Sequence, residues 1–279
     1  MTPSARQVER QRYRRRRALL RGAVAAVSTV LVLGILLAVV LTAPGWDRVQ
    51  RTYFDWQDAK DSIRPVGEAF WLNIRLFVVA EVIILVIALV VAILRVVPSP
   101  ALAPLRLLAT VYTDVFRGTP TLLVVLLVGF GVPALNLSGV PTSLFWLGVT
   151  ALSLSYGAYV AEVIRAGILS VHPSQWNSGR ALGLSYGRTL RHVVLPQALR
   201  RVTPPLLNDF VSLQKDTALL SVIGLVESLR AANIISQREF IFTPLVVAAV
   251  LFIAATIVLA RLADWLTVRA MRRESGGRA

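Results

Sequence analysis

The stretch FWLNIRLFVVAEVIILVIALVVAIL, from Phe70 to Leu94, decides the fold class. A helix needs about 20 consecutive, mostly apolar residues to cross the hydrocarbon layer of a bilayer. This stretch exceeds that length, and its apolar residues follow one another, whereas the strands of membrane barrels alternate apolar and polar residues. It therefore predicts a membrane-spanning α-helix.

Comparable runs recur along the chain, which has 279 residues, of which 56% are hydrophobic. Its mean hydropathy of +0.66 is high for a soluble domain. We predict an all-α, polytopic membrane protein with about six transmembrane helices. Besides Phe70–Leu94 the predicted spans are Ala18–Thr42, Thr119–Leu135, Leu144–Arg165, Pro205–Leu229 and Ile241–Leu266. The alternative for Ala18–Thr42 is a cleaved signal peptide, which its long apolar run disfavours.

Arginine gathers in three segments, namely residues 1–17, 165–201 and 261–279, whereas residues 43–66 balance basic with acidic side chains. Short cytoplasmic segments of membrane proteins retain Lys and Arg. We therefore expect both termini, with tails at 1–17 and 269–279, and the loop at 166–200 to be cytoplasmic, and the loop at 43–66 to be extracytoplasmic. The net charge of +15 is then explained by anionic lipid of the bilayer rather than by nucleic acid.

The sequence offers no catalytic or metal-binding constellation. It has no cysteine, and its two histidines, His172 and His192, have no carboxylates at ligand spacing. The lysines Lys60 and Lys215 do not lie in a phosphate-binding G-x-x-x-x-G-K-[ST] loop. We expect no cofactor, no metal and no enzymatic activity of the chain's own.

The arginine-rich loop has the signals of two short helices. His172-Pro173 predicts a helix start and Gly183 a helix end. Ser185 can cap a second helix, which we expect to stop before Pro196. A loop too short to cross the membrane but helical predicts a docking element for a cytoplasmic partner.

This loop resembles the EAA loop of permease subunits from ATP-binding-cassette importers. Asn177-Ser178-Gly179 fills the E-A-A slot, followed by Gly183, Val193 and Leu195-Pro196 at the family's spacing. The neighbouring stretches VFRGTPTLLVVLL and PPLLNDFVSLQKDTALLSVIG are similar to the polar-amino-acid branch of that family. The resemblance covers roughly residues 66–270, but this chain has Asn177 where members usually carry glutamate.

The resemblance implies a type I importer permease, whose five-span core at 67–268 is preceded here by one more span at 18–42. It implies two cytoplasmic ATPase subunits, a second permease copy or paralogue, and an extracytoplasmic binding protein. The implied substrate is a polar amino acid, either glutamate/glutamine-like or basic. The residues that would couple to the ATPase are Asn177, Ser178, Gly179, Arg180, Ala181, Gly183, Leu195 and Pro196.

Polar residues within membrane helices are costly and are candidates for function. The candidates for the translocation path or its gate are Glu81, Arg117, Glu162, Asn208, Ser212, Lys215 and Asp216. Structural alternatives stay open: Lys215 can reach the interface and pair with Asp216. Glu162 can pair with Arg165 along one helical face, and Arg117 can anchor the inner end of its span.

Three other protein classes remain as alternatives, a secondary carrier, an intramembrane enzyme and a membrane scaffold. A secondary carrier would carry ion-coupling groups on broken helices in repeated halves, and no repeat is visible. An intramembrane enzyme would need clustered catalytic groups, and a membrane scaffold would not need the polar residues at 208–216.

Overall fold

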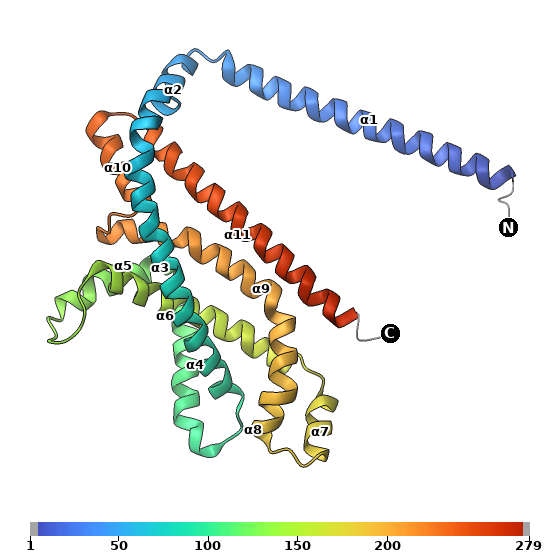
Figure 1. The fold of residues 1–279 in the computed structure, drawn as a ribbon, viewed down its shortest axis with the longest axis vertical. Coiled ribbons are helices and arrows are strands. Elements are labelled where there is room, and N and C mark those ends of the chain that lie inside the picture. The colour runs from blue at the N-terminus through green and yellow to red at the C-terminus, as the bar shows by residue number, and fades with distance from the viewer. Residues whose placement is uncertain (1–4, 276–279) are drawn as a thin grey trace. The chain divides into compact units, whose positions relative to one another are not determined.

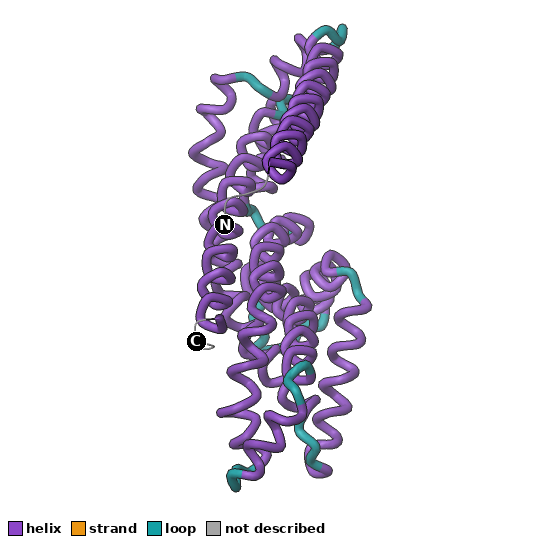
Figure 2. The backbone as a smooth tube through the Cα atoms, turned by 90° about the vertical axis from the view of Figure 1, so that its right-hand side faces the viewer, coloured by secondary structure: helices purple, strands orange, loops and turns teal. Residues whose placement is uncertain are grey.

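The structure is a computed structural model, and it describes residues 5–275, all of whose regular elements are helical (Figures 1 and 2). The chain divides into two compact units, Met1–Asp55 and Trp56–Ala279. Residues 1–4 and 276–279, the ends of the two predicted basic tails, lie outside the described residues, as do the side chains of residues 1–16, 18 and 270–279. The predicted fold class, all-α with several membrane-spanning helices, is confirmed.

The first unit consists of α1 (Ala5–Leu41) and α2 (Trp46–Tyr53). Within α1, Leu19–Leu41 is long and apolar enough to cross a membrane, and none of its most apolar window is buried by the protein. Such a surface suits contact with lipid. Helix α2 lies within residues 43–66, the segment predicted to be an extracytoplasmic loop.

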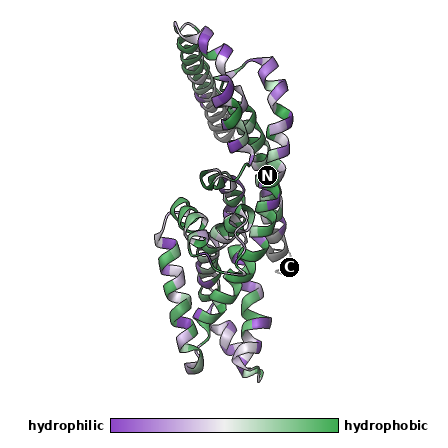
Figure 3. Cartoon of the chain, turned by 90° about the vertical axis from the view of Figure 1, so that its left-hand side faces the viewer, coloured by the Kyte–Doolittle hydropathy of each residue, from purple (hydrophilic) through white to green (hydrophobic). Residues whose placement is uncertain are grey.

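The second unit contains nine α-helices among its described residues. The bounds are α3 (Trp56–Val96), α4 (Ala103–Gly118), α5 (Thr121–Ala134), α6 (Leu144–Leu169), α7 (Pro173–Ala181), α8 (Tyr186–Thr189), α9 (Leu195–Asp216), α10 (Ser228–Glu239) and α11 (Thr243–Ser275). Hydrophobic residues run along the long helices of this unit (Figure 3). Helix α6 packs against α3, α4, α5 and α9, so it forms the centre of the unit.

Glycine residues allow α6 to take this central place. A Cβ atom on Gly157 would lie 2.7 Å from the Tyr112 hydroxyl oxygen of α4. A Cβ atom on Gly148 would lie 2.5 Å from Leu220. Helices in membranes approach closely where side chains are small, because van der Waals packing replaces the hydrophobic effect there.

The third predicted span was wrong in its bounds. The apolar stretch after Pro120 forms α5, which has 14 residues and is too short to cross alone. It joins α4 at a bend of 108°, and only the two helices together have the length of a span. Thr119 is extended (φ −105°, ψ 128°) because a residue before proline avoids the helical region, so the helix breaks there.

The fifth predicted span, Pro205–Leu229, was also placed wrongly. Helix α9 begins at Leu195, runs through Pro204 and Pro205, and ends at Asp216. Because proline has no backbone N–H, only the carbonyls of Arg200 and Arg201, four residues earlier, lose their helical hydrogen bonds. Both residues are exposed. A 3₁₀ segment, Thr217–Ile223, follows, and Gly224 (φ +92°) turns the chain toward α10 at a bend of 49°.

A buried polar network holds this second broken span against α3. Asn73 of α3 donates to Thr217 Oγ1 and to Glu227 Oε2, both at 3.0 Å, and accepts from the Ser228 amide at 3.0 Å. Glu227 caps α10 by accepting from the Leu229 and Arg230 amides at 2.9 Å. Asn73 and Glu227 are fully buried, so water cannot reach them. These hydrogen bonds take the place of those that water would make to the same groups at an exposed site.

We expect Asn73→Ala to destabilise the protein by about 1–3 kcal/mol, because it leaves the buried Ser228 amide without an acceptor and removes one of the two hydrogen bonds to Glu227 Oε2. Thermal unfolding of the purified protein in detergent measures the loss, and Asn208→Ala, at an exposed asparagine, is the matched control. Equal unfolding temperatures for the two variants would show that the network contributes nothing.

Candidate functional site

The loop between α6 and α9 folds largely as expected. His172 caps α7, its Nδ1 accepting from the Ser174 amide at 3.2 Å. Gly183 adopts φ +79°, a left-handed conformation that favours glycine, and it ends the first short helix. Ser185 caps α8 by accepting from the Arg188 amide at 3.4 Å. The predicted start, stop and second cap are therefore confirmed.

The second short helix does not stop before Pro196. Helix α8 passes into a π-helical segment, Leu190–Val194, and then directly into α9. In this segment the Leu195 amide bonds to the Leu190 carbonyl, five residues earlier. Proline usually ends a helix, but the wider π turn and its place near the start of α9 let the chain continue. The loop is thus rigidly continuous with the span that follows.

Close contacts join the two arms of the loop. A Cβ atom on the buried Gly179 would lie 2.6 Å from Thr189 Cγ2, so only glycine fits there. Trp176 of α7 stacks on Tyr186 of α8 with 4.9 Å between ring centroids, and the Tyr186 hydroxyl donates to the Val96 carbonyl of α3 at 3.3 Å. These contacts make the loop a compact body attached to two spans.

The outer surface of this body is exposed. Of the predicted coupling residues, Asn177, Ser178, Arg180, Ala181, Gly183 and Pro196 are exposed, Leu195 is half-buried, and Gly179 is buried. Leu182 is 82% exposed, the highest value for any leucine in the loop. An exposed leucine among polar and basic side chains is suited to contact with another protein.

Glu162 of α6 lies at the centre of an arginine cluster that we define as Arg95, Arg117 and Arg165 with Glu162. Arg165 donates to Glu162 through Nε and Nη2, at 3.1 Å and 2.5 Å, which confirms the predicted pair. Arg95 of α3 donates at 2.6 Å, and Arg117 of α4 lies 3.8 Å away. The structure therefore brings together Glu162 and Arg117, two predicted path residues, and adds Arg95.

A second polar group, which we call the acidic cluster, consists of Glu81, Asp209 and Asp216 with Tyr156. The Tyr156 hydroxyl donates to Asp216 Oδ2 at 2.8 Å. Asp209 is close enough to interact electrostatically with Glu81 and Tyr156, and its Oδ2 atom is buried without a hydrogen bond. Among the described residues, no ion pair joins any of the three carboxylates to a basic side chain. Asp216 thus bonds to Tyr156 and not to Lys215.

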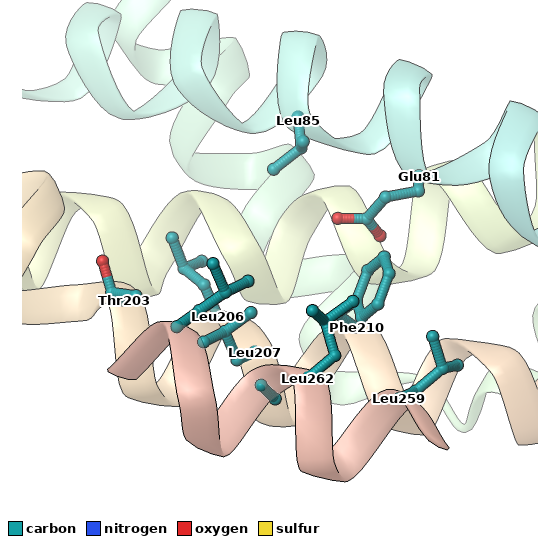
Figure 4. Close-up of a pocket in the computed structure, with 10 residues that line it drawn as sticks. Glu81, Leu85, Thr203, Leu206, Leu207, Phe210, Leu259 and Leu262 are labelled. Carbon is teal, nitrogen blue, oxygen red and sulfur yellow. The ribbon is translucent and has the colours of Figure 1, made fainter. Parts of the chain in front are cut away.

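Glu81 also lines a cavity of about 340 Å³ between α3, α9 and α11. Figure 4 shows its carboxylate beside the Phe210 ring, with Leu259 and Leu262 of α11 on the opposite wall. The other lining residues are Leu85, Thr203, Leu206, Leu207, Ala263 and Leu266, so the walls are almost entirely apolar. Glu81, one of the candidates for the translocation path, thus points into a cavity between three helices.

The remaining predicted path residues are spread over α9. Asn208 and Lys215 are exposed, and Ser212 is half-buried. The polar residues at 208–216 are therefore divided between the surface of the unit and the acidic cluster. Within the described part of the chain there is no group of three or more His, Cys, Asp or Glu residues that could hold a metal ion.

Sequence reasoning missed Arg95 and Tyr156. Arg95 directly follows the predicted span Phe70–Leu94, and an arginine at a span end normally indicates only the interface. Tyr156 is an amphipathic side chain whose sequence neighbours carry no charge, so no local pattern marked it. Both acquire partners from helices distant in sequence.

The chain matches known membrane transport proteins. Residues 101–272 match the family described as binding-protein-dependent transport system inner membrane component. The chain is 33% identical over 193 residues to the arginine transport system permease protein of Bacillus subtilis (strain 168), covering 69% of this chain and 86% of that protein. It is 38% identical over 198 residues to the L-cystine transport system permease protein of the same organism, covering 71% and 78%.

A similar relative is the glutamate transport system permease protein of Corynebacterium glutamicum, 34% identical over 213 residues, covering 72% of this chain and 91% of the relative. Among solved structures, a chain of an amino acid ABC transporter crystallised with histidines aligns with a TM-score of 0.69 at 30% identity, covering 77% and 98%. A chain of the MetNI methionine ABC transporter, with a TM-score of 0.62 at 16% identity and coverage of 74% and 96%, shares the fold. This chain belongs to the family of binding-protein-dependent transport system inner membrane components, the permease subunits of ATP-binding-cassette importers.

Proposed function

We propose that the protein is the membrane-spanning subunit of an importer for cationic amino acids, driven by ATP hydrolysis in separate subunits. The observation that carries the substrate class is the acidic cluster of Glu81, Asp209 and Asp216, carboxylates that no basic side chain of the described chain neutralises. Uncompensated carboxylates within membrane helices are expensive, and a cationic ligand would offset that cost. The named relatives are permeases for arginine, L-cystine and glutamate, so an amino acid is the substrate class that we infer.

The cavity beside Glu81 supports a substrate with a long aliphatic side chain. Its walls are leucine and phenylalanine side chains, and its one acidic group is Glu81. Methylene groups pack against apolar walls while the terminal cation meets a carboxylate, which is how lysine and arginine side chains bury their stems. Glu81, Asp209, Asp216 and Tyr156 would line the path, with Ser212, Asn208 and Lys215 nearer its margin.

The loop from α7 to α9 would couple the spans to the ATPase. Its residues are held by the Gly179–Thr189 and Trp176–Tyr186 contacts, and its outer surface is exposed. A rigid body joined directly to α6 and α9 transmits a push at its surface to two spans at once. The interacting residues would be Asn177, Ser178, Arg180, Ala181, Gly183, Leu195 and Pro196, with Gly179 in a packing role. The Asn177 side chain could donate and accept hydrogen bonds there, but it supplies no charge where members of the family usually carry glutamate.

The assembly would contain two permease copies, or this chain and a paralogue, with two cytoplasmic ATPase subunits and an extracytoplasmic binding protein. The distribution of arginine favours both termini and the coupling loop on the cytoplasmic side. Access to the acidic cluster would alternate between the two sides, since a ligand changes an equilibrium only by binding one state more tightly than the other. The chain itself would make and break no covalent bond.

We expect Asp216→Asn to reduce uptake of radiolabelled L-arginine roughly tenfold or more in vesicles containing the complete importer, because one hydrogen-bonded carboxylate facing a cation is lost. Asp264→Asn, at an exposed carboxylate 4.0 Å from Arg261, is the control and should transport normally. Unchanged L-arginine uptake in Asp216→Asn, or a wild-type importer that moves L-glutamine and not L-arginine, would refute the cationic substrate.

Replacing Gly183 tests the coupling loop. Gly183→Leu forces a branched residue into the left-handed region at a cost of about 1–2 kcal/mol. It should distort the loop and lower the amount of amino acid taken up per ATP hydrolysed. The rate of ATP hydrolysis itself should stay the same or fall. Gly187→Leu places the same side chain in the same loop where φ is not positive and no atom lies within 4 Å of the Cβ. Equal uptake per ATP in the two variants would contradict the assignment, and Gly183→Asn should retain most coupling, since asparagine tolerates positive φ.

A further inference from the structure

The arginine cluster holds more positive charge than its carboxylate can neutralise. Glu162 carries one negative charge, and Arg95, Arg117 and Arg165 carry three positive charges, so two remain. The four side chains are 12–41% exposed. Excess charge of one sign in a half-buried group between membrane helices is costly and predicts an anionic ligand.

The hydrogen-bonding capacity of Glu162 is already taken by two of the arginines. Arg165 binds it through Nε and Nη2, and Arg95 binds Oε2 at 2.6 Å. Arg117 lies 3.8 Å from the same oxygen, beyond hydrogen-bond distance, and its guanidinium makes no hydrogen bond to any described residue. At 41% exposure it is the most accessible of the three. Arg117 therefore has planar donors free for a carboxylate, which arginine binds in two-point fashion.

Both clusters include residues of α6, namely Glu162 and Arg165 in the arginine cluster and Tyr156 in the acidic cluster. Tyr156 donates to Asp216, Tyr159 donates to the Arg117 carbonyl at 3.0 Å, and Glu162 follows on α6. Six residues from Tyr156 to Glu162 correspond to about 9 Å along a helix. That separation is comparable with the length of an extended arginine or lysine molecule, from its α-carboxylate to its terminal cation.

We propose that Arg117, within the arginine cluster, binds the α-carboxylate of the transported amino acid, while the acidic cluster binds its cationic end. The proposal rests on the proposed function as an amino-acid permease, because it assigns the second end of the same substrate. A phosphate of an anionic lipid has the same chemistry, but the link through Tyr159 to the acidic cluster favours a ligand that carries both charges.

The test measures equilibrium binding of L-arginine and of agmatine, which is arginine without its carboxylate, to the purified permease–ATPase complex in nanodiscs. Wild type should bind L-arginine more tightly than agmatine. Arg117→Gln should weaken L-arginine binding roughly tenfold or more, the usual effect of losing a charged hydrogen bond, and leave agmatine binding within about twofold. Arg117→Lys should retain part of the discrimination because it keeps the charge.

Controls separate a binding role from a structural one. Arg261→Gln, at an arginine that is 83% exposed, should change neither ligand. Arg95→Gln removes the least exposed arginine of the cluster. If the cluster is purely structural, Arg117→Gln should behave like Arg95→Gln and weaken the binding of L-arginine and of agmatine equally. Such equal weakening, or intact discrimination in Arg117→Gln, would overturn the proposal.

The lipid composition and the choice of ligand separate the remaining explanations. In phosphatidylcholine nanodiscs, wild type could bind L-arginine more tightly than agmatine and lose this preference when phosphatidylglycerol is added. That result would assign the site to lipid phosphate and overturn the proposal. If wild type binds L-glutamine and not L-arginine, the cationic substrate fails. The carboxylate site is then tested with L-glutamine against 4-aminobutanamide, its decarboxylated analogue. A complex that binds neither amino acid would refute both proposals.

Discussion

The structure depends on satisfying backbone polar groups where no water reaches them. Two of its spans are broken, and each break exposes amides and carbonyls that an unbroken helix would pair internally. In the second break Glu227 accepts from two amides of α10, and Asn73 accepts from a third. A carboxylate and an amide side chain thus complete a helix end, and the same two residues bind α3 to the broken span.

The broken spans also place polar side chains where continuous helices would place apolar ones. The bend between α4 and α5 follows Arg117, and the end of α9 follows Asp216. Both residues contact the central helix α6, Arg117 through Tyr159 and Glu162, and Asp216 through Tyr156. A basic group from α4 and an acidic group from α9 therefore both contact α6, and a zwitterionic ligand with a cationic side chain would need groups of both signs.

The loop between α6 and α9 is held together by small residues and aromatic rings rather than by charge. Gly179 admits Thr189 at a distance that a Cβ atom would prevent, and the Trp176–Tyr186 stack closes the other side. The absence of a Glu at position 177 leaves these contacts unchanged, because the Asn177 side chain is exposed and outside them. The residues that pack the loop internally are thus different from the exposed residues that we propose contact the ATPase.

The sequence alone determined the helical membrane fold and the ends of α7 at His172 and Gly183, and it offered the Glu162–Arg165 pair as one alternative. Each of these depends on apolar length, on a local conformational preference, or on neighbours within one helical turn. Tertiary structure decided where the spans break, because Pro204 and Pro205 end a helix only if their lost hydrogen bonds are not offset elsewhere. It also decided that Arg95 and Arg117 reach Glu162 and that Asp216 bonds to Tyr156 rather than to Lys215. These pairings join residues from different helices, and no pattern within one helix specifies which side chain its neighbour will present.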